Sequence, residues 1–194
     1  MAAEASTDAI LVEAARHGDV DSYAQLVQRY QALAHRTAFA LGAGDDTADV
    51  VQEAFVKAYL ALGRFRTAEP FRPWLLKIVA NEARNRWRWH SRHRTVPLPL
   101  IGDDLLSSAT LTPERAVEEL ETIRSLRDAL AALLTHQRNV VVCRYLLELS
   151  EEETAQVLGV PGGTVKSRLS RGLAALQLAL NRTIASADME RRRV

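Results

Sequence analysis

The chain has a single cysteine, Cys143, and six prolines among its 194 residues. One cysteine excludes an internal disulfide and a cysteine-rich zinc site. Because Cys143 lies in an apolar run, we expect a core residue rather than a reactive thiol. No apolar run approaches the roughly 20 residues that span a bilayer, and the N-terminus lacks a basic-then-apolar leader. These absences predict a cytoplasmic protein that makes no membrane contact.

Recognisable catalytic patterns are lacking too. The sequence contains no glycine-rich phosphate loop, no metal-ligand cluster and no nucleophile–base set. His90 and His93 are spaced to share a metal, but no Cys or acidic partner is near them. We therefore predict no cofactor, no metal site and no catalytic residue, and the chain is not expected to be an enzyme by itself.

Charge is present but unevenly distributed, although the formal net charge is only +1. Residues 1–53 contain three Arg against nine Asp and Glu. Residues 64–94 contain eight Arg and one Lys against two Glu. An acidic segment beside a basic one predicts two different partners, one of them polyanionic.

Every strong apolar periodicity in the chain is helical, so the predicted fold is all-α. Pro97, Pro99 and Pro113 bracket a stretch rich in turn residues, which predicts an interdomain linker. The expected organisation is two small helical domains joined by this linker, the second containing a helix-turn-helix. The boundaries are a first domain at 1–95, the linker at 96–112, a second domain at 113–183 and a basic tail at 184–194.

The helix predicted to follow Asp46, with that residue as its cap, has two distinct faces. Its apolar stripe, assigned to the core, contains Ala48, Val51, Phe55, Ala58, Tyr59 and Leu62. Its outward face has Asp49, Gln52, Glu53 and Val56 at helical spacing, so it is acidic and polar apart from Val56. This face is either an ordinary solvated surface or a docking surface for a partner.

A basic helix is predicted to open at Pro73. Steps of four, three and four residues place one polar stripe on it, formed by Lys77, Asn81, Arg84 and Arg88. Trp87, Trp89 and Arg92 follow, and cations mixed with aromatic rings suit a nucleic-acid backbone with exposed bases. The alternative is a solvated helix end with Trp87 packed in the core.

Residues 150–171, SEEETAQVLGVPGGTVKSRLSR, predict two short helices joined by a glycine turn. Ser150 and Glu153 form a capping box at the start of the first helix, and Gly159 ends it. On the second helix, one face presents Thr164, Ser167, Arg168 and Arg171. Such a face suits a major groove and its flanking phosphates. The alternative is an αα-hairpin with a solvated basic side.

Three motifs in this order resemble a bacterial sigma factor of the extracytoplasmic function group. They are DDTADVVQEAFVKAYLALGRFR, FRPWLLKIVANEARNRW and LSEEETAQVLGVPGGTVKSRLSRG, and the resemblance covers nearly the whole chain. It implies that the acidic helix docks on the clamp helices of the largest catalytic subunit of core RNA polymerase. It also implies contact with the flap of the second-largest subunit and with promoter DNA, and makes an anti-sigma factor a further candidate partner.

The resemblance assigns three sets of residues. The core-polymerase set is Asp45, Asp46, Asp49, Gln52, Glu53 and Val56. The set for the minus-10 promoter element is Lys77, Asn81, Arg84, Asn85, Arg88 and Arg92. The set for the minus-35 element is Thr164, Lys166, Ser167, Arg168, Ser170 and Arg171.

Two rivals remain from the residues. A repressor or activator that binds duplex DNA without polymerase leaves the acidic face unused, and a helical adaptor has no sequence-specific DNA contact. The chain also departs from the family at Gly172, where Ala is common. A glycine inside a helix costs about 1 kcal/mol relative to Ala.

Overall fold

The computed structural model describes residues 2–66, 69–93 and 113–191, with side chains at 7–66, 69–90 and 122–182. The described chain is helical, with no strand among these residues, as the periodicity predicts. The expected linker at 96–112 and the side chain of Arg92 lie outside the described residues.

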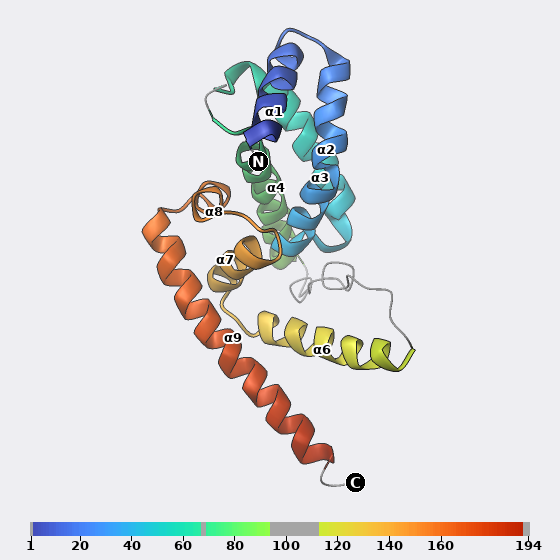
Figure 1. Cartoon of the computed structure of the whole chain (residues 1–194), viewed down its shortest axis with the longest axis vertical. Coiled ribbons are helices and arrows are strands. Elements are labelled where there is room, and N and C mark those ends of the chain that lie inside the picture. The colour runs from blue at the N-terminus through green and yellow to red at the C-terminus, as the bar shows by residue number, and fades with distance from the viewer. Residues whose placement is uncertain (1, 67–68, 94–112, 192–194) are drawn as a thin grey trace.

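Four long helices form the N-terminal domain, in the upper half of Figure 1. They are α1 (Ala2–Arg16), α2 (Val20–Ala38), α3 (Thr47–Ala61) and α4 (Phe71–His93). Asp19 caps α2 by accepting from the backbone N–H groups of Asp21 and Ser22, at 3.0 and 3.3 Å. The fully buried side chains of this domain include Leu26, Val50, Leu75, Leu76 and Val79.

The turn between α2 and α3 sets the angle between these helices. It consists of a π-helical turn, Phe39–Ala43, and a 3-10 turn, Gly44–Asp46. Gly42 has φ of +109° and lies against the Trp87 side chain, which is half-buried. A second short 3-10 turn, Leu62–Arg64, leads from α3 toward α4.

The C-terminal domain contains α6 (Pro113–Ala131), α7 (Thr135–Tyr145), α8 (Glu151–Leu158) and α9 (Gly162–Arg191). The predicted capping box is confirmed, because Glu153 N–H donates to Ser150 Oγ and Ser150 N–H donates to the Glu153 carboxylate. Gly159 ends α8 in the left-handed conformation, as predicted. Two boundaries differ from expectation: α4 begins at Phe71, before Pro73, and α9 continues through Arg191, into the segment expected to be a tail.

The two domains are in contact. Helix α8, the first helix of the helix-turn-helix, packs against α4, and α9 packs on α8 and α7 (Figure 1). The helix-turn-helix therefore lies beside the basic helix of the other domain, an arrangement that the sequence did not predict.

Gly172 lies where α9 crosses α7. A Cβ there would stand 2.9 Å from Val141 Cγ2 and 3.3 Å from the Gln137 carbonyl oxygen. Both distances are shorter than ordinary van der Waals contact, and Val141 is buried and β-branched. The glycine thus permits close packing of two helices, which offsets its low helix propensity.

We expect Gly172→Ala to destabilise the protein by about 1 kcal/mol, since overpacking costs about 1–3 kcal/mol and the propensity gain is only about 1. Urea unfolding followed by circular dichroism measures the change. Gly163→Ala is the control, because a Cβ at Gly163 meets nothing within 4 Å. A Gly172→Ala protein as stable as the Gly163→Ala protein would show that α7 and α9 separate without penalty.

Candidate partner and nucleic-acid interfaces

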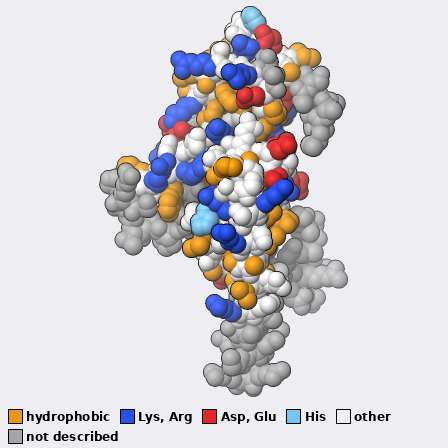
Figure 2. All heavy atoms as spheres, turned by 90° about the vertical axis from the view of Figure 1, so that its left-hand side faces the viewer, with side chains coloured by type: hydrophobic (Ala, Val, Ile, Leu, Met, Phe, Trp, Pro, Cys, Tyr) orange, Lys and Arg blue, Asp and Glu red, His pale blue; other side chains and the backbone are white. Residues whose placement is uncertain are grey.

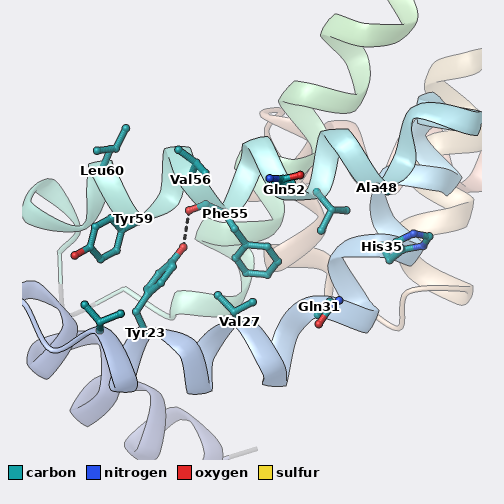
Figure 3. A pocket seen from close by; sticks show the side chains of 12 residues that line it. Tyr23, Val27, Gln31, His35, Ala48, Gln52, Phe55, Val56, Tyr59 and Leu60 are labelled. Atoms are coloured by element: carbon teal, nitrogen blue, oxygen red, sulfur yellow. Dashed lines mark hydrogen bonds between the residues drawn. The ribbon is translucent and has the colours of Figure 1, made fainter.

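An apolar groove of about 750 Å³ lies between α2 and α3 (Figure 3). Its α2 side presents Val20, Tyr23, Val27, Gln31 and His35, and its α3 side presents Ala48, Val51, Gln52, Phe55, Val56, Tyr59 and Leu60. Val56 is 54% exposed and Leu60 77% exposed. A contiguous apolar surface of this kind on a polar protein indicates a site for a partner.

The groove contains two predicted core-polymerase residues, Gln52 and Val56, and several that sequence reasoning missed. Tyr59 and Ala48 were assigned to the core, but both are exposed and face the groove. Periodicity marks an apolar face without saying whether the chain itself covers it. Leu60 was the signal in the sequence that this apolar face reaches the surface. It is apolar but lies outside the stripe assigned to the core, and it is exposed in the structure.

The acidic residues beside the groove fall into two groups. Asp45 and Asp49 are exposed and form no ion pair with any described residue. Glu53 pairs with Lys57 Nζ at 2.8 Å, and Lys57 also reaches Glu82 at 2.7 Å. The hydrogen bond from Lys57 lowers the pKa of Glu53. Asp45 and Asp49 therefore present uncompensated negative charge at the surface, whereas Glu53 is partly neutralised.

Asp46 stands at the cap position of α3, but its side chain makes no capping hydrogen bond, so that prediction was wrong. Its carboxylate instead contacts His90 Nε2 and lies 4.0 Å from Arg86 Nη1, both on α4. His90 and Arg86 on α4 therefore occupy the carboxylate oxygens that would otherwise cap the helix. Asp46 thus ties the end of α4 to the start of α3.

The predicted minus-10 stripe lies along one side of α4. Lys77, Asn81, Asn85 and Arg88 are exposed, as is Trp89 at 56%. The amide oxygens of Asn81 and Asn85 accept from Arg84 and Arg88, at 2.9 and 2.7 Å. Arg84 differs from the rest because it is half-buried against α8.

Helix α9, the second helix of the helix-turn-helix, presents its predicted residues on one accessible side. Lys166, Ser167, Ser170 and Arg171 are exposed, and Thr164 and Arg168 are half-buried. Val165, on the opposite side, is fully buried. Lys166 Nζ lies 3.7 Å from Glu151 of α8, so it is partly engaged across the turn. Figure 2, which views the α8 and α9 side, shows Lys and Arg side chains on both domains.

Two family models match the chain in the order of its domains. Sigma-70 region 2 matches residues 26–93, and Sigma-70, region 4 matches residues 123–176. The first match contains most of the groove lining and the whole of α4, and the second contains the helix-turn-helix. The fold and the surfaces therefore define a two-domain protein of the sigma-70 class.

Individual relatives narrow the class. The ECF RNA polymerase sigma factor SigW of Bacillus subtilis is 30% identical over 87% of this chain and 94% of its own length. The ECF RNA polymerase sigma-E factor of Escherichia coli K12 is 32% identical over 89% of this chain and 94% of its own. The chain belongs to the extracytoplasmic function (ECF) sigma factors of the sigma-70 family.

Solved structures agree with this fold. CnrH, solved in complex with the cytosolic domain of CnrY, is 30% identical with a TM-score of 0.68, covering 91% of this chain and 98% of that one. The sigma factor RpoE of Bartonella quintana, in complex with the anti-sigma factor NepR, has a TM-score of 0.66 at 23% identity, covering 84% of this chain and 98% of that one.

Among the described helices, none has the length and apolar content needed to cross a bilayer.

Proposed function

We propose that this chain is an alternative sigma factor that binds core RNA polymerase, recognises minus-35 and minus-10 elements and promotes DNA opening. This proposal rests on one observation: three separate candidate binding surfaces occur together on one ECF chain. They are the apolar groove between α2 and α3, the polar stripe of α4 and the basic side of α9. Neither rival, the DNA-binding regulator or the adaptor, uses all three.

The groove and its acidic border are proposed to receive core polymerase. A helical partner such as the clamp helices of the largest catalytic subunit places apolar side chains between α2 and α3, which buries Val56 and Leu60. Asp45 and Asp49 then face basic residues of the partner, which assists association more than final affinity. The flap of the second-largest subunit is proposed to contact the C-terminal domain.

The two remaining surfaces are proposed to hold promoter DNA. On α9, Arg168 and Arg171 suit bidentate contact with guanine edges, and Lys166 suits phosphate contact. On α4, Lys77 and Arg88 suit the phosphates of an opened strand, and Asn81 offers an amide that donates to and accepts from a base edge. The chain itself supplies no catalytic step in this scheme.

The domain boundaries stated above, 1–95 and 113–183, are proposed to separate the polymerase and minus-10 functions from the minus-35 function. An anti-sigma factor is a further proposed partner, because the relative CnrH was solved bound to a second protein, the cytosolic domain of CnrY. Such a partner would be expected to compete with core polymerase for exposed apolar surface.

Run-off transcription with core polymerase on a library of genomic promoters tests the proposal. We expect the chain to direct initiation at a subset that shares both elements. Core polymerase alone is the control. A chain that binds promoter duplexes but gives no core-dependent transcript would instead support the regulator, and failure to bind either DNA or core would support the adaptor.

The base-contacting role of Asn81 has its own test. Asn81→Ala is expected to impair promoter opening through its effect at one base position of the promoter. The salt dependence of opening should barely change. Lys77→Ala is the contrasting variant, because loss of a phosphate contact weakens every promoter and flattens the salt slope. Permanganate footprinting of unpaired thymines, on promoters varied one base at a time, separates the two. An Asn81→Ala protein with parental preference would rule out base contact.

A further inference from the structure

The first turn of α8 contains three successive glutamates, which differ in what they contact. Glu153 completes the capping box with Ser150. Glu152 is exposed and forms no ion pair with any described residue. Glu151 reaches across the turn of the helix-turn-helix, where its Oε1 atom lies 3.7 Å from Lys166 Nζ on α9. Among the described contacts, Glu151 is therefore the glutamate that meets the predicted minus-35 surface.

The carboxylate of Glu151 also lies at the start of α9. Its Oε1 atom stands 3.5 Å from the position that a Cβ on Gly162 would occupy, and Gly162 is the first residue of that helix. Pro161, whose carbonyl accepts the first hydrogen bonds of α9, has no side-chain acceptor that could cap it. The partial positive charge of a helix N-terminus favours an acid. Lys166 and the first turn of α9 thus both attract Glu151.

The ion pair between Glu151 and Lys166 matters more for DNA than for folding. Their side chains are 40% and 73% exposed, and exposed pairs of this kind contribute little to stability. A phosphate oxygen bound about 2.8 Å from Lys166 Nζ would lie no more than about 6.5 Å from Glu151 Oε1 as the carboxylate now stands. This separation is below the Debye length of about 8 Å at physiological salt, so the phosphate and the carboxylate repel each other. The carboxylate therefore competes with the phosphate for Lys166.

We propose that Glu151 is an internal competitor of the DNA backbone, which occupies Lys166 and lowers the affinity of the minus-35 surface for any duplex. Because it acts through Lys166, Glu151 is a positioning residue and contacts no base. Sequence preference stays with Arg168 and Arg171, since a phosphate contact carries no base information. This inference rests on the proposed function. It adds that one acid of the chain limits its electrostatic attraction to DNA.

Glu151→Gln tests this competition in holoenzyme assembled with core polymerase. The probes are a duplex from a promoter identified by run-off transcription and the same duplex with its minus-35 element scrambled, each titrated over a range of salt concentrations. One more cation free to neutralise a phosphate should steepen the salt slope by about 0.9, which at about 0.15 M salt corresponds to about fivefold higher affinity. Both duplexes should bind more tightly by the same factor, so the ratio of their affinities should not change.

Glu152→Gln is the matched control, because it removes one charge from the same turn of α8 without releasing a cation. It should keep the parental salt slope. Lys166→Ala and the double variant with Glu151→Gln complete a mutant cycle, in which most of the effect of Glu151→Gln should disappear once Lys166 is gone. The sign of the effect separates this role from a structural one, because a loss of stability would weaken binding.

Tighter binding of both duplexes, with a steeper salt slope that depends on Lys166, supports the proposal. Parental affinity and slope in Glu151→Gln overturn it, and so does an equal gain in the Lys166→Ala background, which would indicate a general effect of charge. A changed preference between the two duplexes also overturns it, because Glu151 would then contact a base. A parent holoenzyme without preference for the native duplex contradicts the proposed function and removes the basis of this inference before any variant is compared.

Discussion

Val56→Arg should reduce binding of the chain to core RNA polymerase by at least about 30-fold, or about 2 kcal/mol. Val56 is 54% exposed at the rim of the α2–α3 groove, so the substitution disturbs no buried contact of the free protein. In the complex, however, an arginine there must lose water within an apolar interface, where no described acid of the groove lining compensates it. Affinity measured by fluorescence anisotropy at physiological salt gives the result.

Ile10→Arg is the matched control, because Ile10 is an exposed apolar residue on α1 outside the groove. It should leave affinity unchanged. Charge reversal at Asp49 should have a smaller effect that fades as salt is raised, since an exposed charge acts through long-range attraction. Parental affinity of Val56→Arg would remove the groove from the polymerase interface, whatever the acidic residues do.

Replacing both Arg168 and Arg171 with Ala should weaken binding to the minus-35 duplex by about 2 to 6 kcal/mol. Each arginine that forms a bidentate guanine contact contributes about 1–3 kcal/mol, and two separate base contacts combine roughly additively. The measurement uses holoenzyme assembled with core polymerase, since the proposed function has the chain act on promoters in that complex. Each single variant should also relax preference at one base pair.

The control for this prediction is Arg182→Ala, which removes a basic side chain from the same helix about three turns further on. It should change affinity little. Lys166→Ala should instead weaken all sequences alike and lower the salt slope by about one, as expected for a phosphate contact. If the double variant binds the native promoter as tightly as the parent, α9 is not the recognition helix.

Local sequence signals predicted much of this fold correctly. The Ser150–Glu153 capping box and the left-handed Gly159 are determined by a few neighbouring residues, and both are as predicted. The helical periodicity is equally local. By contrast, the capping role predicted for Asp46 was wrong because its carboxylate contacts partners on α4, about 40 residues away. Local sequence patterns do not reveal such partners.

The candidate surfaces divide in the same way. Spacing along one helix placed the α9 residues on one side, and the structure agrees. The groove needs two helices, and five of its twelve lining residues come from α2, so no pattern along one helix reveals it. The hydrogen bond from Arg84 to α8 depends on how the two domains meet. The need for glycine at position 172 is explained only by Val141, which lies across the α7–α9 contact.

The hydroxyl of Tyr23 donates to the Phe55 carbonyl at 2.6 Å, across the floor of the groove, and the Tyr23 and Tyr59 rings pack with centroids 4.9 Å apart (Figure 3). Burial raises the pKa of Tyr23, so the phenol keeps its proton under all physiological conditions. The width of the groove is thus fixed before any partner arrives. Preorganisation of this kind removes an ordering entropy that a flexible surface would lose on association. Binding at the groove itself should then show the negative heat-capacity change of apolar burial, without the larger change that accompanies folding of a disordered segment.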